Sequence, residues 1–270
     1  MNKRIIFISL YLFISIKSVT AQYLFLLAGQ SNAVGQGDSL KSPICPPNLC
    51  FEFDASENRF VPLKDPAGKS WRLFQKAGTG SIAPAFAKKL NELSGEKIYL
   101  VTAARGGASC SKMAEMSNYG TWDTSGALFD LAVQKTKMAE NMSNAKLSGI
   151  LWMQGERDAN AILNGELSAA EYRRALIGLI RRFRKSFTNN LPFYIVQTGY
   201  QQDKAPKGCR AVRLVQASVA RRMKNVYLAY AETDKFGERK WFKDNVHYNQ
   251  EALNDIGWKT ASFVFNHSKH

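Results

Sequence analysis

The sequence contains very little histidine, and this limits the chemistry that the chain can perform. Three of its 270 residues are histidines, and two of them, His267 and His270, lie in the last four residues, within a polar tail. His247 is therefore the one histidine placed for a catalytic role. Neither the histidines nor the cysteines have the spacing of metal ligands, so we expect no metal and no other cofactor.

Long apolar segments are also absent. The longest, Ile5 to Ile16, has about 12 residues, whereas a helix that crosses a bilayer needs roughly 20. It follows two basic residues and precedes small residues that end at Ala21, which is the pattern of an export signal. We therefore predict a signal peptide over residues 1–21, export to the periplasm or the medium, and no stable membrane insertion after its removal.

Acidic residues are scarce relative to basic ones. The chain has 22 aspartates and glutamates against 37 lysines and arginines, which gives a formal net charge of +15. The basic residues gather in short clusters, such as Arg181 to Lys185, that fall within expected helices. Such clusters are typical of a solvated helix face, although they also suit an anionic polymer as a partner. Nucleic-acid binding is not required to explain them, and we expect none.

Cysteine is infrequent, with four residues in the chain. In an exported protein an even number of cysteines is compatible with disulfide bonds. Cys45 and Cys50 flank a short proline-containing segment and form the favoured pair, which leaves Cys110 and Cys209 as the second pair. All three connectivities of four cysteines stay open at this point.

The rest of the chain is expected to form one α/β domain, residues 22–270. Its length of roughly 250 residues suits one well-buried core. Short apolar runs alternate with amphipathic helical patterns, an order that predicts a mainly parallel sheet covered by helices on both faces. Five strands are expected, at residues 23–28, 97–103, 149–153, 192–196 and 226–230.

Helices are expected between these strands. The clearest follows Ser168, which forms a capping box with Glu171, and its apolar residues up to Phe183 share one face. A long stretch rich in proline and glycine, Gly35 to Gly80, is expected to be irregular and to form part of a substrate cleft. The other expected helices cover residues 81–93, 125–142, 212–223 and 250–265.

The chemically informative segments fall where strands end or helices begin. Loops at the carboxyl ends of parallel strands gather along one edge of the sheet. The informative segments are therefore expected to form a single site. They are Gly29 to Asn32, Ala104 to Gly107, Gln154 to Glu156, and Asp244 to His247.

These segments contain the parts of a serine hydrolase. Ser31, at the end of a buried strand, is the candidate nucleophile. His247 is its candidate base, and Asp244, three residues upstream, would orient the imidazole. An ester attacked by serine develops an oxyanion that fixed donors must stabilise. The candidate donors are the backbone N–H groups of Ser31 and Gly107 and the side-chain amide of Gln154.

The same segments resemble successive blocks of the SGNH hydrolase superfamily. More narrowly, Gly29-Gln30-Ser31-Asn32 and the block Trp152 to Asp158 resemble the sialate O-acetylesterase and carbohydrate esterase family 6 group, which includes acetylxylan esterases. The resemblance implies a three-layer α/β/α sandwich of the flavodoxin-like type and hydrolysis of acetyl esters on sugars without a cofactor. It gives the triad and the oxyanion-hole residues the same roles as above.

Three positions depart from the family pattern or leave a choice open. Ala33 stands where family members usually carry Met, so a larger or more loosely packed pocket floor is expected. Arg157 replaces a residue that is usually small, and it is expected to pair with Glu156 or Asp158 or to face an anionic substrate. Glu156 is also a rival of Asp244 for the role of triad acid, because some members of the group are described with Glu in that role.

The sequence therefore predicts an exported serine esterase that removes O-acetyl groups from a carbohydrate of the acetylxylan or sialate type. Within the enzyme class, the alternative is a deacetylase of bacterial wall polymers, which are anionic and suit a basic surface. Outside it, the alternative is a non-catalytic carbohydrate-binding protein on the same fold. The joint presence of Ser31, Asp244 and His247 argues against the latter, because a binding protein needs none of the three.

Overall fold

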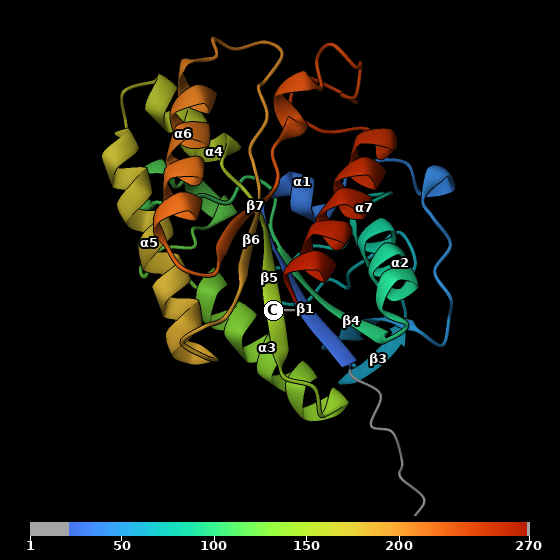
Figure 1. Cartoon of the computed structure of the whole chain (residues 1–270). Coiled ribbons are helices and arrows are strands. Elements are labelled where there is room, and N and C mark those ends of the chain that lie inside the picture. Colours follow the sequence, from blue (N-terminus) through green and yellow to red (C-terminus); the bar gives the residue numbers. More distant parts are fainter. Residues whose placement is uncertain (1–21, 269–270) are drawn as a thin grey trace, which may run out of the picture.

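The computed structural model describes residues 22–268, which form one seven-stranded sheet with helices around it (Figure 1). The strands are β1 Gln22–Gly29, β2 Cys50–Asp54, β3 Arg59–Pro62, β4 Lys97–Ala104, β5 Leu147–Met153, β6 Phe193–Val196 and β7 Val226–Tyr230. The helices are α1 Ser31–Val34, α2 Ala83–Ser94, α3 Leu128–Ser143, α4 Glu156–Leu163, α5 Ala169–Ser186, α6 Lys207–Arg222 and α7 Gln250–His267. The signal peptide predicted over residues 1–21 lies outside the described residues.

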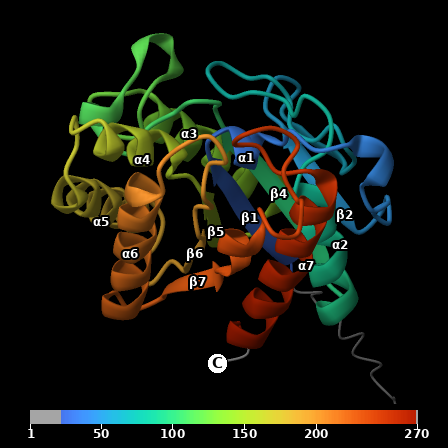
Figure 2. The ribbon, with the colours of Figure 1, turned by 90° about the horizontal axis from the view of Figure 1, so that it is seen from above.

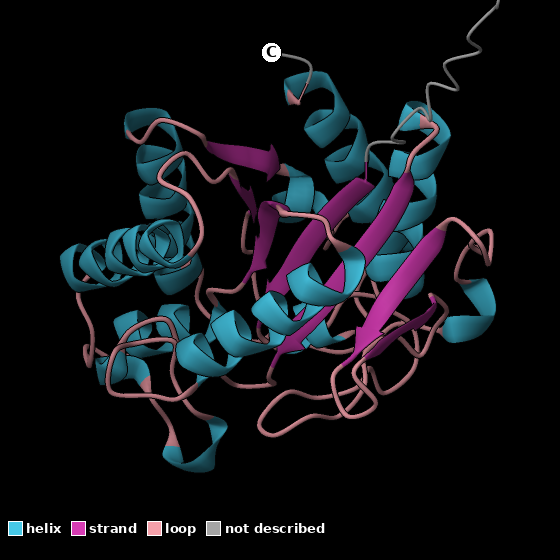
Figure 3. Ribbon diagram, turned by 90° about the horizontal axis from the view of Figure 1, so that it is seen from below, coloured by secondary structure: helices cyan, strands magenta, loops and turns pink. Residues whose placement is uncertain are grey.

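Alternate residues of β1 enter two separate hydrophobic clusters. Leu24, Leu26 and Ala28 pack with α3, α5 and α6, whereas Phe25 and Leu27 pack with α2 and α7. This division follows from the geometry of a strand, in which successive side chains point to opposite faces of the sheet. Figures 2 and 3 show the resulting layers, with the strands between two groups of helices. The predicted three-layer α/β/α sandwich is confirmed.

The sheet has two strands more than expected. Its order is β3-β2-β4-β1-β5-β6-β7, and every neighbouring pair is parallel except β2 with β3. The five predicted strands are present. The hairpin of β2 and β3 lies inside the stretch expected to be irregular, and it was missed because its strands have only five and four residues and lie between segments rich in proline and glycine.

The five predicted helices are present with shifted ends, and α4 is additional. The capping box of α5 is present, since Ser168 Oγ accepts from the Glu171 N–H and the Glu171 carboxylate accepts from the Ser168 N–H. Helix α6 begins at Lys207, earlier than expected. The last helix extends through His267, so this histidine belongs to α7 rather than to a polar tail. No helix within residues 22–268 is long and apolar enough to cross a membrane.

The predicted disulfides are absent, because all four cysteines carry free and buried thiols. Cys45 and Cys50 do lie together, and the hydrogen bond between them raises the pKa of Cys45 and lowers that of Cys50. The Cys45 thiol also contacts the Pro84 carbonyl oxygen at 3.4 Å. Cys110 belongs to the connection after β4, whereas Cys209 lies on α6. The prediction of disulfide bonds is therefore wrong for this structure.

The order of the strands places a crevice at the carboxyl end of β1. The chain pairs β4 with one side of β1 and β5 with the other. Where successive connections leave a parallel sheet in opposite directions, the loops separate and leave a crevice that typically binds a ligand. The segments that follow β1, β4 and β5 are the ones that carry the candidate chemistry.

Candidate active site

An open cavity of about 600 Å³ lies where these segments meet. Its wall includes Ser31 after β1, Gly107 after β4, Glu156 after β5 and His247 before α7. Residues separated by more than half of the chain are thus neighbours in one cavity. This is the arrangement that the positions of the motifs predict.

Ser31 is the first residue of α1 and follows a tight turn at the end of β1. The turn depends on Gly29, which has a φ of 148° and would place a Cβ atom 2.0 Å from the Met153 carbonyl oxygen. The Gln30 N–H donates to the same oxygen at 3.0 Å and fixes the turn against β5. Within the described chain, neither the backbone N–H nor the hydroxyl of Ser31 has a hydrogen-bond partner. Both groups are therefore available to a substrate.

His247 and Asp244 form the closest acid–base pair of the site. The distance between His247 Nδ1 and Asp244 Oδ2 is 2.7 Å. The other carboxylate oxygen accepts from the backbone N–H groups of His247, at 2.7 Å, and Val246, at 2.9 Å. Partial desolvation raises the pKa of Asp244, but these hydrogen bonds outweigh it and hold the pKa below its usual value. An ionised Asp244 fixes Nδ1 as the protonated nitrogen and leaves Nε2 to act as a base.

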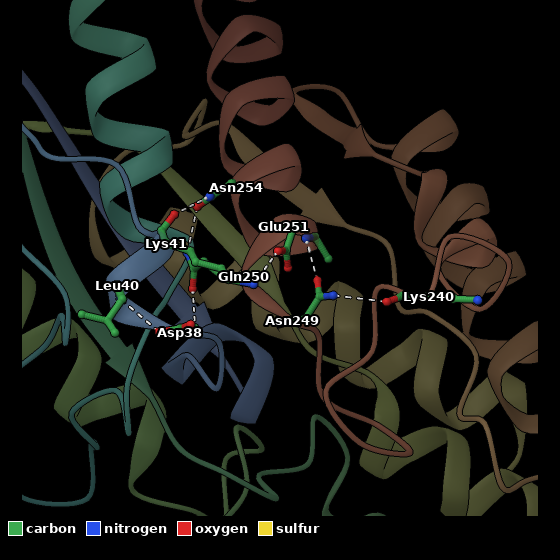
Figure 4. A network of polar contacts seen from close by, with 9 residues as sticks. Asp38, Leu40, Lys41, Lys240, Asn249, Gln250, Glu251 and Asn254 are labelled. Atoms are coloured by element: carbon green, nitrogen blue, oxygen red, sulfur yellow. Dashed lines mark hydrogen bonds and ion pairs between the residues drawn. The ribbon is translucent and has the colours of Figure 1, made fainter.

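The first turn of α7 begins three residues after His247, and Figure 4 shows the polar contacts that fix this turn. Asn249 caps this helix and donates to the Lys240 carbonyl oxygen at 3.2 Å. Gln250 accepts from the Asp38 N–H at 3.1 Å. The chain directly after His247 is therefore fixed to the Lys240 segment and to the loop that follows α1.

Asn32 connects the serine to the histidine. Its Nδ2 group donates to Glu156 Oε1 at 2.8 Å and to the Val246 carbonyl oxygen at 3.2 Å, and its Oδ1 accepts from the Tyr248 N–H at 3.1 Å. Val246 and Tyr248 flank His247 in the chain. Sequence reasoning gave Asn32 no role, although its place directly after Ser31 in the Gly-Gln-Ser-Asn motif was a usable signal.

Two carboxylates beside the cavity are buried: Glu156, in its wall, and Asp158, behind it. Desolvation raises the pKa of both, and hydrogen bonds from Asn32 to Glu156 and from the Cys110 N–H to Asp158 oppose the rise. Glu156 Oε2 has no hydrogen-bond partner among residues 22–268. Glu156 acts on His247 through its charge, whereas Asp244 is the carboxylate that binds the ring.

Gly107 presents a free backbone N–H to the cavity. Its φ of 73° lies in the left-handed region, and a Cβ atom there would lie 2.5 Å from the ring of Tyr119, so glycine is required. The preceding N–H, of Gly106, donates to Gln75 Oε1 at 2.6 Å, whereas that of Gly107 has no acceptor in the described part of the chain. Arg105 holds this loop by donating to the Tyr119 carbonyl oxygen at 3.0 Å.

Gln154 is oriented away from the cavity. Its Nε2 group donates to Asp158 Oδ2 at 2.5 Å, to the Ala108 carbonyl oxygen at 3.2 Å and to Gln30 Oε1 at 3.3 Å. The residue is 1% exposed and does not line the cavity. An amide has two hydrogens, and protein acceptors occupy both. This geometry does not support the expected role of Gln154 as an oxyanion-hole donor.

The two departures from the family pattern have structural counterparts. Ala33 is buried in the hydrophobic cluster beside α2 and α7 and does not line the cavity, so the expected change at the pocket floor is not found. Arg157 does line the cavity. Its Nε donates to the Ala114 carbonyl oxygen at 2.6 Å, and its Nη2 lies 3.5 Å from Glu166, so it forms no ion pair with Glu156 or Asp158.

The remaining wall is rich in side-chain amides. An amide both donates and accepts hydrogen bonds, as a sugar hydroxyl does. Within residues 22–268, no group of three or more His, Cys, Asp or Glu side chains is arranged to hold a metal ion. The amides of the wall, apart from Gln30, are those of Gln36, Gln75, Asn160, Asn164, Gln201 and Asn245.

Comparison with protein families gives a match over nearly the whole chain. Residues 21–266 match the model of a family described as carbohydrate esterase, sialic acid-specific acetylesterase. None of the curated protein sequences matches the chain significantly.

Solved structures share the fold at low sequence identity. A protein from Arabidopsis thaliana is 22% identical, with a TM-score of 0.72, over 92% of this chain and 98% of its own. NanS is 16% identical, with a TM-score of 0.65, over 93% of this chain and 98% of its own. A carbohydrate acetylesterase from Xanthomonas citri is 18% identical, with a TM-score of 0.60, over 89% of this chain and 55% of its own.

Proposed function

We propose a serine mechanism for this chain, which belongs to the carbohydrate esterase family of sialic acid-specific acetylesterases. Membership makes it a carboxylic ester hydrolase that acts on O-acetyl groups of carbohydrates. The observation that carries the proposal is the presence of Ser31 and the Asp244–His247 pair in one cavity, with free N–H groups beside the serine.

In the first half of the reaction, Ser31 Oγ attacks the carbonyl carbon of the acetyl group while His247 Nε2 takes the hydroxyl proton. Asp244 keeps the proton on Nδ1 and stabilises the imidazolium that forms. The backbone N–H groups of Ser31 and Gly107 stabilise the oxyanion. The bond to the sugar oxygen then breaks, and His247 returns the proton to that oxygen. The sugar alcohol leaves, and an acetyl-serine remains.

In the second half, water replaces the sugar. His247 accepts a proton from the water, whose oxygen attacks the acetyl-serine, and the same oxyanion donors act again. Collapse of the second tetrahedral intermediate returns the proton from His247 to Ser31 Oγ and releases acetic acid, which ionises to acetate. The cycle consumes one water and needs no cofactor.

The substrate is proposed to be an acetylated sugar of the xylan or sialate type. The amide-rich wall supports this proposal, because it offers paired donors and acceptors to sugar hydroxyls. The lining of the cavity carries two basic residues, Arg157 and Lys204, and two acidic ones, Glu156 and Asp203, so both types of sugar stay in the proposal. We further propose that residues 1–21 are an export signal and that the enzyme acts outside the cytoplasm.

An active-site-directed phosphonate tests the mechanism. A fluorophosphonate ester reacts with an activated serine and not with ordinary hydroxyls. We expect a single label on Ser31, located by peptide mass mapping, and loss of that label in His247→Ala. A label on another serine, or undiminished labelling of His247→Ala, would contradict the proposed triad.

A further inference from the structure

We infer that the Gln30 side chain supplies the third oxyanion-hole donor, in place of Gln154. The inference rests on the proposed serine mechanism and concerns a residue to which that mechanism gives no role. Gln30 directly precedes Ser31 and lines the same cavity. Four observations carry the assignment.

First, the Gln30 side chain is held by fixed donors at the start of α4. Gln30 Oε1 accepts from the Gly155 N–H at 3.3 Å and from the Arg157 N–H at 3.2 Å. A third donor, Gln154 Nε2, lies 3.3 Å from the same oxygen. These contacts immobilise a long side chain that otherwise has several rotamers, and an immobile donor is what an oxyanion hole requires.

Second, the same contacts settle which way the amide points. A backbone N–H is only ever a donor, so the atom of Gln30 that faces Gly155 and Arg157 must be the oxygen. The NH₂ group therefore points to the opposite side. The orientation follows from chemistry and does not depend on telling oxygen from nitrogen.

Third, the Gln30 NH₂ group is unused by the protein. Nε2 has no hydrogen-bond acceptor in the part of the chain that the structure describes, and it is not among the polar atoms sealed from solvent. Gln30 is only 4% exposed, and it lines the cavity that Ser31 lines. The exposed edge of an otherwise buried amide thus belongs to the reaction site.

Fourth, the alternative donor is occupied. Gln154 Nε2 is committed to Asp158 Oδ2 and the Ala108 carbonyl oxygen, and Asp158 is itself fixed by the Cys110 and Ser111 N–H groups. Gln154 thus contributes to the oxyanion hole as a positioning residue: its Nε2 lies 3.3 Å from Gln30 Oε1 and faces the oxygen of that amide, which leaves Gln30 Nε2 free for the oxyanion.

Two substitutions of Gln30 separate a catalytic role from a structural one. Gln30→Met removes both the donor and the acceptor. Gln30→Glu keeps an oxygen for the Gly155 and Arg157 N–H groups but removes the NH₂ group. Steady-state hydrolysis of 4-nitrophenyl acetate, inhibition by phenylboronic acid and the melting temperature are measured for both, beside wild type, Ser31→Ala and Gln154→Met.

We expect both Gln30 variants to lose about 10²- to 10³-fold in kcat, with little change in KM. Phenylboronic acid forms a tetrahedral adduct on serine, so its affinity should fall by a similar factor in both. Gln30→Glu should melt closer to the wild type than Gln30→Met, because the start of α4 keeps its acceptor. If Gln30→Glu has both the activity and the melting temperature of the wild type, the role of Gln30 is structural, and the inference is overturned.

The failure of this inference is distinguishable from the failure of the proposed function. An active wild type, an inactive Ser31→Ala and fully active Gln30 variants refute only the role of Gln30. If Gln154→Met loses about 10²- to 10³-fold in kcat and the Gln30 variants do not, Gln154 is the oxyanion-hole donor, and the inference is refuted. Activity retained by Ser31→Ala refutes the serine mechanism, and the inference with it.

Discussion

The Asn32 side chain donates a hydrogen bond of 2.8 Å to the Glu156 carboxylate, across 124 positions of sequence. The same amide binds the Val246 carbonyl oxygen and the Tyr248 N–H. The residue after the proposed nucleophile therefore holds the segment that carries the proposed base. Glu156 acts as the buried anchor of this connection, which gives it a role other than that of triad acid.

Replacement of Asn32 should damage both stability and activity. Asn32→Ala leaves the buried Glu156 without its hydrogen-bond donor and frees the backbone on both sides of His247. We expect the free energy of unfolding to fall by about 2–4 kcal/mol and kcat to fall by at least about 10-fold. Chemical denaturation and ester hydrolysis measure the two effects. Asn189→Ala, at an exposed turn, should change neither, and an unaltered kcat in a less stable Asn32→Ala would argue against the positioning role.

Two isosteric substitutions identify the triad acid. Asp244→Asn removes the charge that binds His247 Nδ1 at 2.7 Å, and kcat should fall about 10²- to 10⁴-fold because the ring loses its orientation and its counter-charge. Glu156→Gln keeps an acceptor for Asn32 and should cost less than about 10-fold. Kinetics at saturating substrate give the comparison. A larger loss in Glu156→Gln than in Asp244→Asn would transfer the role to Glu156.

Glu52 should make stability depend on pH. Desolvation raises its pKa to about 7 from the ordinary value of 4.5, despite the Gly68 N–H and the charge of Lys135. A carboxyl with a raised pKa binds its proton more tightly in the folded state, so deprotonation costs stability as the pH rises from 4.5 towards 7. Glu52→Gln cannot ionise. The difference in melting temperature, variant minus wild type, should therefore increase between about pH 5 and about pH 7.5.

The control for Glu52 is a glutamate in the neighbouring turn. Glu57 is exposed and pairs with Arg59, so Glu57→Gln should give a difference in melting temperature that changes little over the same range. If the difference in melting temperature between Glu52→Gln and the wild type also changes little with pH, burial does not hold Glu52 in its protonated form.

The cysteines should be reduced and slow to react. All four thiols are buried, so a disulfide-exchange reagent should modify them slowly in the native protein. After denaturation without a reductant, the reagent should titrate four thiols per chain. Two or fewer equivalents would indicate that disulfide bonds form in the protein, with Cys45 and Cys50 as the first pair to examine.

The fold was largely predictable because its central strands are apolar. β1, β4 and β5 are buried on both faces, and such strands appear as continuous hydrophobic runs. β2 lies nearer the edge, carries two acidic residues and was missed. The short helix α4 was missed because it has only eight residues and no side-chain cap at its start.

The site was predictable at the level of segments but not of side-chain direction. Strand-end loops meet wherever the sheet is parallel, so the positions of Ser31 and His247 followed from the order of strands. The direction of the Gln154 amide depends on Asp158, whose carboxylate is fixed by two backbone N–H groups from another loop. Such a tertiary contact leaves no local pattern in the sequence.

The most direct test of the account is acetate release from an acetylated sugar by the wild type and by Ser31→Ala. The measurement uses acetylated xylan and O-acetylated sialic acid, with circular dichroism to establish that the variant is folded. The proposed serine mechanism predicts turnover of at least one substrate by the wild type and none above background by folded Ser31→Ala. Equal acetate release by both proteins would contradict the assignment of Ser31 as the nucleophile.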